Sequence, residues 1–218
     1  MSRAAPSEAQ PDRDCPLCPR LTAFRRTQRS LFPDWHNAPV ASFGGEDVRL
    51  LIVGLAPGLR GANRTGRPFT GDFAGVLLYE TLRKFGFARG AYAERADDGL
   101  ALIDCRVTNA VRCVPPENKP EPAEIAACNR FLQVEIRSLP RLNAILALGA
   151  IAHQAVLAAL GERRSAFPFG HGAMHTLSSG LVLADSYHCS RYNTNTGKLT
   201  SVMFEAVFAA LRKALDRG

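Results

Sequence analysis

Four of the six cysteines are spaced in a way that suits a metal site. Cys15 and Cys18 form a Cys-x-x-Cys pair near the N-terminus, while Cys113 and Cys128 lie fifteen positions apart in the middle of the chain. Four thiolates suit either a zinc ion with four cysteine ligands or a [4Fe–4S] cluster. Zinc sites more often repeat a short spacing in both halves, so the long second spacing favours the iron–sulfur cluster. Disulfides or ordinary core cysteines are the alternatives, and Cys105 and Cys189 stand alone.

A glycine-containing segment is the second candidate for chemistry. Gly54-Leu55-Ala56-Pro57-Gly58 follows an apolar run and precedes a segment with basic and acidic residues, Arg64 to Asp72. Glycines let the backbone approach a ligand closely, and backbone amides there can donate to an anion. A phosphate or a nucleobase would both suit such a loop. Neither nucleotide-binding fingerprint is present, and a plain tight turn between a strand and a helix is the alternative.

Asn109 and His188 each follow a run of residues that predicts a strand. An amide offers one donor and one acceptor, as the edge of a pyrimidine requires. An imidazole can donate to an oxygen that gains negative charge. Each residue could instead be a satisfied core residue, but their position at strand ends favours a ligand site.

The elements that must position these residues alternate between strands and helices. Apolar runs predict strands at 48–55, 104–111, 143–148 and 181–187, and helical patterns predict helices at 17–30, 74–85, 122–138, 149–160 and 201–214. This order predicts an α/β fold with three layers, α/β/α, around a central four-stranded, mainly parallel sheet. Ligands of such sheets bind beyond the carboxyl ends of the strands, which is where the loops above should meet.

Composition predicts a single domain over residues 14–218, preceded by a polar, disordered leader at residues 1–13. No run reaches the ~18 apolar residues of a membrane helix, and no signal-peptide core is present. We therefore expect a soluble, cytoplasmic monomer. Twenty-seven Lys and Arg against twenty Asp and Glu give a formal charge of +7, which favours nucleic acid as the partner. The first predicted helix should carry Arg20, Arg25, Arg26 and Arg29 on its polar side.

Taken together, these segments resemble the iron–sulfur uracil-DNA glycosylases, and most closely their B-type, or family-5, branch. The resemblance extends from Cys15 to the last helix. It rests on the cysteine pattern, the Gly54–Gly58 loop and three further segments, which are Gly66-Arg-Pro-Phe-Thr-Gly-Asp72, Thr108-Asn-Ala-Val-Arg-Cys113 and His188-Cys-Ser-Arg-Tyr-Asn-Thr-Asn-Thr-Gly197.

The resemblance implies a monofunctional glycosylase that flips uracil, and deaminated bases such as hypoxanthine and xanthine, out of DNA and hydrolyses the N-glycosidic bond in base excision repair. It implies a catalytic set of Asp72, Asn109 and His188. Substrate contacts are implied for Phe69, Asn193 and the loop residues Gly54, Leu55, Ala56, Pro57 and Gly58. DNA contacts are implied for Arg64, Arg67, Arg191, Tyr192, Asn195 and Lys198, and a phosphate contact is also conceivable for Arg112. The four patterned cysteines would hold a [4Fe–4S] cluster.

The chain departs from the related families at two positions. The sibling family-4 branch carries an acidic residue where this chain has Leu55, and a leucine cannot activate water, so Asp72 becomes the candidate carboxylate. The usual His-Pro-Ser motif is His188-Cys189-Ser190 here, which affects the loop conformation. These departures keep a second hypothesis open, that of an iron–sulfur protein that binds damaged or single-stranded DNA without cleaving it. A zinc-containing nucleotide hydrolase is the third.

Overall fold

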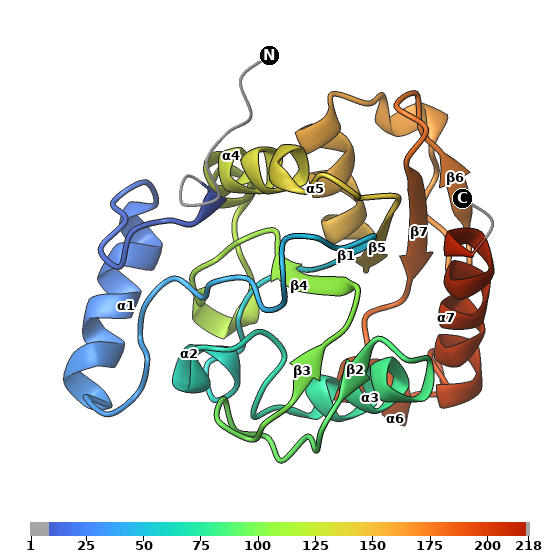
Figure 1. The fold of residues 1–218 in the computed structure, drawn as a ribbon. Coiled ribbons are helices and arrows are strands. Elements are labelled where there is room, and N and C mark those ends of the chain that lie inside the picture. Colours follow the sequence, from blue (N-terminus) through green and yellow to red (C-terminus); the bar gives the residue numbers. More distant parts are fainter. Residues whose placement is uncertain (1–8, 217–218) are drawn as a thin grey trace.

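The structure is a computed structural model that describes residues 9–216. Its centre is a sheet of five strands in the order β4-β1-β5-β7-β6 (Figure 1). The four predicted strands are present and mutually parallel, as β1 (Leu50–Gly54), β4 (Cys105–Asn109), β5 (Ala144–Leu148) and β7 (Val182–Ser186). Three of these strands, β1, β4 and β5, are buried along their whole length. This explains the continuous apolar runs of β1 and β5, whereas β4 also buries Arg106, which pairs with Glu135.

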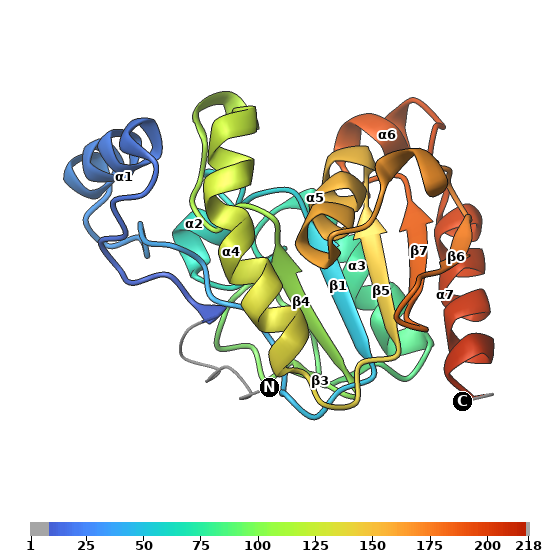
Figure 2. The same cartoon turned by 90° about the horizontal axis from the view of Figure 1, so that it is seen from above.

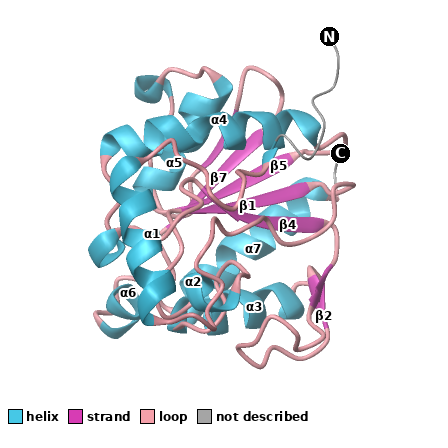
Figure 3. Cartoon of the chain, turned by 90° about the vertical axis from the view of Figure 1, so that its left-hand side faces the viewer, coloured by secondary structure: helices cyan, strands magenta, loops and turns pink. Residues whose placement is uncertain are grey.

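Helices cover both faces of the sheet, as predicted. α4 (Pro122–Ser138) and α5 (Ala150–Leu160) lie on one face, and α3 (Phe73–Lys84) and α7 (Ser201–Leu215) lie on the other (Figure 3). Each face has its own apolar core. α1 (Pro19–Leu31) stands outside these layers, beyond the β4 edge of the sheet (Figure 2). Two short helices, α2 (Ala62–Thr65) and α6 (Arg191–Asn195), complete the set.

The sheet has one strand more than the four predicted. β6 (Met174–Thr176) pairs antiparallel with β7 and forms the far edge. It is only three residues long and its side chains are partly exposed, so it carries no apolar run that could mark it as a strand. A separate antiparallel pair, β2 (Ala88–Arg89) and β3 (Ala101–Leu102), flanks an excursion of the chain.

The structure describes only part of the segment that was expected to be a disordered leader, residues 1–13. Residues 1–8 lie outside the described residues, and of residues 9–13 the first three lie against the domain while Asp12 and Arg13 are exposed. Ala9 is buried, and the Gln10 amide contacts the Ser42 hydroxyl and the Arg112 guanidinium. A polar composition does not exclude order where buried polar groups provide partners. No helix within residues 9–216 is long and apolar enough to cross a membrane.

Candidate active site at the carboxyl edge of the sheet

The loop after β1 borders a wide cleft of about 770 Å³ at the carboxyl edge of the sheet. Leu55, Ala56, Pro57 and Gly58 line it, as predicted for a ligand-binding loop. Gly54 does not line the cleft but supports it from below. A Cβ at this position would lie 2.5 Å from both Asn109 Oδ1 and Phe69 Cζ, so only glycine lets these two side chains approach the strand.

Asn109 presents a buried amide to the cleft. It is the last residue of β4, in register with Gly54 of β1, and its side chain is among the cleft-lining groups. The residue is 3% exposed, and its Oδ1 atom has no hydrogen-bond partner. A buried acceptor without a partner costs free energy unless something else satisfies it. The orphaned oxygen is therefore suited to a donor from a bound molecule.

Phe69 forms an apolar wall of the same cleft. Its ring lies 5.9 Å from the His188 ring, centroid to centroid, with 29° between the planes. The residue has a left-handed backbone, with φ of +51°, which is strained for a side chain of this size. The surrounding contacts must hold this conformation in place.

His188 follows β7 and lines the cleft opposite the β1 loop. Burial lowers the pKa of its imidazole to about 4, so the ring is neutral at neutral pH. The Asn193 amide donates to the His188 carbonyl over 2.8 Å, and the Ser190 hydroxyl caps α6. Asn193 is absent from the residues that line the cleft. The Asn193 side chain thus contacts the histidine loop, and its role in substrate binding stays a prediction.

Asp72 lines the cleft and also caps α3. Its Oδ1 accepts from the Gly75 amide at 3.2 Å, while Oδ2 faces the β1 loop, 3.2 Å from where a Cβ on Gly58 would lie. Burial raises the pKa of the carboxyl above its usual 3.8, and the Gly75 amide opposes that shift. The cleft thus combines one carboxylate, one neutral imidazole and one unpaired amide around a cavity open to solvent.

Comparison with known proteins identifies the family to which this arrangement belongs. The family description "Uracil DNA glycosylase superfamily" matches residues 41–212, which include every cleft residue named above. The chain belongs to the uracil-DNA glycosylase superfamily.

Relatives within this superfamily confirm the predicted branch. The chain is 47% identical over 207 residues to a type-5 uracil-DNA glycosylase of Thermus thermophilus, covering 92% of this chain and 94% of the relative. A type-5 enzyme of Mycobacterium tuberculosis is 41% identical, covering 91% of this chain and 77% of that protein. One from Pyrobaculum aerophilum is 38% identical, covering 92% and 88%.

Most of the residues that the superfamily resemblance assigned to DNA are exposed beside the cleft. Arg191 lines the cleft mouth, with its guanidinium 5.3 Å from the Phe73 ring, and Tyr192 is 74% exposed. The Lys198 amine lies 4.9 Å from the Tyr187 ring. Arg64 and Asn195 are exposed as well. Arg191, Tyr192 and Asn195 belong to the short helix α6.

Arg67 and Arg112 are buried and unavailable to DNA. Arg67 is 5% exposed and forms a two-point ion pair with Asp98, both contacts at 2.8 Å. Arg112 is 1% exposed and pairs with the buried Glu135. The predicted phosphate contact of Arg67, and the one considered for Arg112, are wrong for the same reason, because each guanidinium is engaged inside the domain.

Sequence reasoning missed the part of the cleft that follows β5. Leu148 and the first turn of α5, residues 149–152, line the cleft, and Ile151 is 44% exposed there. Arg60, Phe73 and Asn118 line it too. The signal was available, because β5 is parallel to β1 and must end at the same edge. An apolar helix start carries no polar residue to attract notice.

The four patterned cysteines line one small cavity, away from the cleft. Its other walls are mainly apolar and include Leu21, Val111 and Phe131. Within residues 9–216, no three His, Cys, Asp or Glu side chains come close enough to hold a single metal ion. Four soft donors distributed around a cavity match the donor set of a cluster of several metal atoms.

Arg25 extends from α1 and closes this cavity. It was predicted to lie on the polar side of the helix, but it is buried. It is 2% exposed, its Nη1 donates to Cys113 Sγ at 3.1 Å, and its Nη2 donates to the Cys15 carbonyl at 3.0 Å. The Arg112 amide donates to Cys128 Sγ at 3.4 Å. Donors aimed at sulfur stabilise negative charge on it, which suits thiolate ligands.

Proposed function

We propose that the protein is a monofunctional uracil-DNA glycosylase that flips uracil from DNA and hydrolyses its N-glycosidic bond in base excision repair. The observation that carries this proposal is the unpaired Asn109 oxygen, buried in a cleft beside the Phe69 ring. Uracil carries an N3–H donor, which this oxygen can accept while Phe69 covers the face of the base. Membership of the uracil-DNA glycosylase superfamily and the printed names of the type-5 relatives support the same activity.

Stabilisation of the leaving base falls to the neutral His188. When the bond between C1′ and N1 breaks, its electron pair stays with uracil, whose oxygens gain negative charge. A neutral imidazole carries one N–H group, and this group can donate a hydrogen bond to such an oxygen. Amides of the Leu55–Gly58 loop lie along the same cleft and can add further donors.

Asp72 serves the other half of the reaction. The breaking bond leaves cationic character on the sugar, which an ionised carboxylate stabilises, and water then bonds to C1′ and passes a proton to that carboxylate. Asp72 is the one carboxylate among the residues that line the cleft within the described chain. Leu55 lines the cleft as well and has no group that could take a proton.

We extend the proposal to hypoxanthine and xanthine. These bases have two rings, and the cleft volume of about 770 Å³ leaves room beyond a single pyrimidine. The apolar wall formed by Leu148 and residues 149–152 offers contact without a fixed pattern of donors and acceptors. A tolerant wall combined with one amide favours a broad range of deaminated bases.

Release of bases from single-lesion oligonucleotides tests the proposal. The wild type should release uracil, hypoxanthine and xanthine, and Asp72→Asn and Asn109→Ala should each slow uracil release by about a hundredfold or more. Asp97→Asn, at an exposed carboxylate, is the matched control and should keep the wild-type rate. A wild type that binds the lesions but leaves every one intact would establish the non-catalytic alternative.

We also propose that Cys15, Cys18, Cys113 and Cys128 hold a [4Fe–4S] cluster. The thiols line one cavity, and donors from Arg25 and Arg112 point at two of the sulfurs, which supports this assignment. The cluster would supply a structural link between α1 and the segment after β4. The proposed hydrolysis requires no electron transfer, so no step depends on it.

Metal analysis of the protein purified without oxygen checks the cluster. We expect iron and sulfide in equal amounts, about four of each per chain. Cys18→Ser should lose most of the iron and lower the melting temperature, whereas Cys105→Ala, outside the cavity, should keep the iron. Stoichiometric zinc without iron would overturn the assignment.

A further inference from the structure

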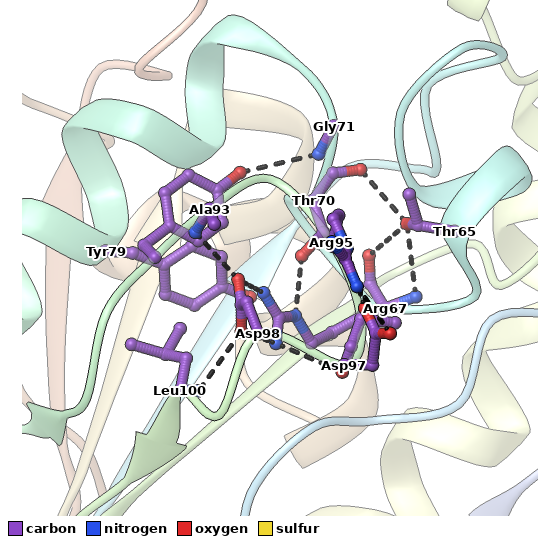
Figure 4. A network of polar contacts seen from close by, with 12 residues as sticks. Thr65, Arg67, Thr70, Gly71, Tyr79, Ala93, Arg95, Asp97, Asp98 and Leu100 are labelled. Carbon is purple, nitrogen blue, oxygen red and sulfur yellow. Dashed lines mark hydrogen bonds and ion pairs between the residues drawn. The ribbon is translucent and has the colours of Figure 1, made fainter.

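Arg67 and Asp98 form the centre of a buried polar network beside the cleft (Figure 4). The side chains of both residues are nearly inaccessible, 5% and 1% exposed. The guanidinium also donates through Nε to the Thr70 hydroxyl at 2.8 Å. Its carbon lies 5.0 Å from the Phe43 ring and 5.5 Å from the Tyr79 ring. A cation enclosed by aromatic rings and a carboxylate has little freedom to move.

The network holds the turn that carries Phe69 and leads to Asp72. The Tyr79 hydroxyl donates to the Pro68 carbonyl at 2.5 Å, and the Tyr92 hydroxyl donates to the Phe69 carbonyl at 3.1 Å. These bonds fix the backbone on both sides of the left-handed Phe69 residue. The turn cannot relax away from the cleft while they are in place.

Asp98 fastens this turn from a different part of the chain. It lies in the excursion between β2 and β3, and its carboxylate also accepts from the backbone amides of Ala93 (2.9 Å) and Leu100 (3.1 Å). The Arg67 guanidinium lowers the pKa of Asp98 well below the ordinary value, so the carboxylate is ionised across the working range. Asp98 is absent from the residues that line the cleft.

We propose that Asp98 is a positioning residue for base release, which acts through Arg67 to hold Phe69 and Asp72 where the base and the sugar require them. The inference rests on the roles given to Phe69 and Asp72 in the proposed function. The planar fork of an arginine fixes direction as well as distance when it meets a carboxylate at two points, and a point charge cannot do the same. Small displacements of a reacting group carry a large cost in rate.

Single-turnover uracil release, measured per folded molecule, tests the proposal. Asp98→Asn keeps the side-chain volume but replaces one acceptor oxygen with an NH2 group, which cannot accept from the guanidinium. We expect this variant to slow release by about tenfold to a hundredfold. Affinity for undamaged duplex should stay within about threefold of wild type, since the exposed basic residues are untouched. Asp97→Asn is the matched control, because its pair with Arg95 lies in the same excursion with side chains 72% and 70% exposed.

Tyr92→Phe is the second variant, because it leaves the ion pair intact and removes only the hydroxyl that holds the Phe69 carbonyl. It should slow release in the same direction with a smaller change in melting temperature. In a Phe69→Ala background, Asp98→Asn should have less effect than it does alone, because coupled residues are not additive.

Wild-type release rates in both Asp98→Asn and Tyr92→Phe, with or without a lowered melting temperature, would overturn the positioning role. An inactive wild type would instead overturn the proposed function, so the two failures are distinguishable.

Discussion

Burial shifts the pKa values of Asp72 and His188 in opposite directions. Removal from water disfavours the charged form of each group, so the carboxyl pKa is raised and the imidazole pKa is lowered to about 4. The His188 imidazole is therefore neutral at neutral pH, while the Asp72 carboxyl takes up its proton at a higher pH than an exposed aspartate does. The proposed hydrolysis requires the ionised form of Asp72 and the neutral form of His188.

The pH dependence of uracil release follows from these two pKa values. As pH falls through the raised pKa of Asp72, the carboxylate is protonated and the rate should fall, with its acid limb above the ordinary 3.8. His188 stays neutral above about 4, so it should add no limb near its ordinary pKa of 6.5. Single-turnover rates between about pH 4 and about pH 8 provide the measurement.

Asp72→Asn should retain only a slow, pH-independent rate over that range. A limb near 6.5 in the wild type that disappears in His188→Gln would contradict this interpretation.

At the scale of elements, the catalytic groups depend on short connections after the strands. His188 stands two residues beyond the end of β7, and its carbonyl is held by Asn193 from α6. α6 has only five residues, and none of its side chains is buried. A helix this short is not stable by itself. It persists because Ser190 caps it and the Asn193 bond ties it to the histidine loop.

Asn193→Ala should therefore slow uracil release by about tenfold while it leaves the melting temperature nearly unchanged, because it releases a loop and not the core. Release rates and thermal melting, measured side by side, provide the check. Thr196→Ala removes an exposed hydroxyl just beyond the same helix and serves as the control. An Asn193→Ala enzyme that matches Thr196→Ala in rate would show that the loop needs no such tie.

At the scale of the whole molecule, the excess of positive charge is divided between structure and surface. Arg25, Arg67 and Arg112 are buried and engaged with sulfur or carboxylates. Arg64, Arg191 and Lys198 are exposed. The net charge of +7 is thus a poor guide to which residues meet DNA. The monomeric state and cytoplasmic location that the composition predicts remain predictions.

The salt dependence of DNA binding shows which exposed basic residues contact phosphates. The affinity for DNA falls as the salt concentration rises, so a plot of log affinity against log salt has a negative slope. Each phosphate contact that is removed should reduce the magnitude of this slope by about 0.9, as expected for B-DNA. We expect this change for Arg191→Ala and Lys198→Ala, measured by titration of a fluorescent duplex. Arg95→Ala, whose exposed side chain is already paired with Asp97, is the control. Unchanged slopes in both variants would exclude α6 and its surroundings from the DNA interface.

Much of the architecture could be predicted from the sequence, because local patterns carry it. The buried strands β1 and β5 carry continuous apolar residues, and parallel strands place their carboxyl ends at one edge. The alternation of elements is therefore enough to bring the loops after β1, β4 and β7 to a common site. The sequence did not predict β6, because its three partly exposed residues form no such apolar run.

The sequence by itself determined which residue types gather at the cleft and which cysteines form a group. Tertiary structure decided which polar side chains remain free. Arg67 and Arg191 read alike in the sequence, yet one is buried against Asp98 and the other lies at the cleft mouth. Asn109 and Asn193 are likewise the same residue type, yet the Asn109 oxygen is buried without a partner whereas the Asn193 nitrogen donates to the His188 carbonyl. Pairing depends on contacts between distant segments, and burial makes those contacts strong, so no local pattern can reveal it.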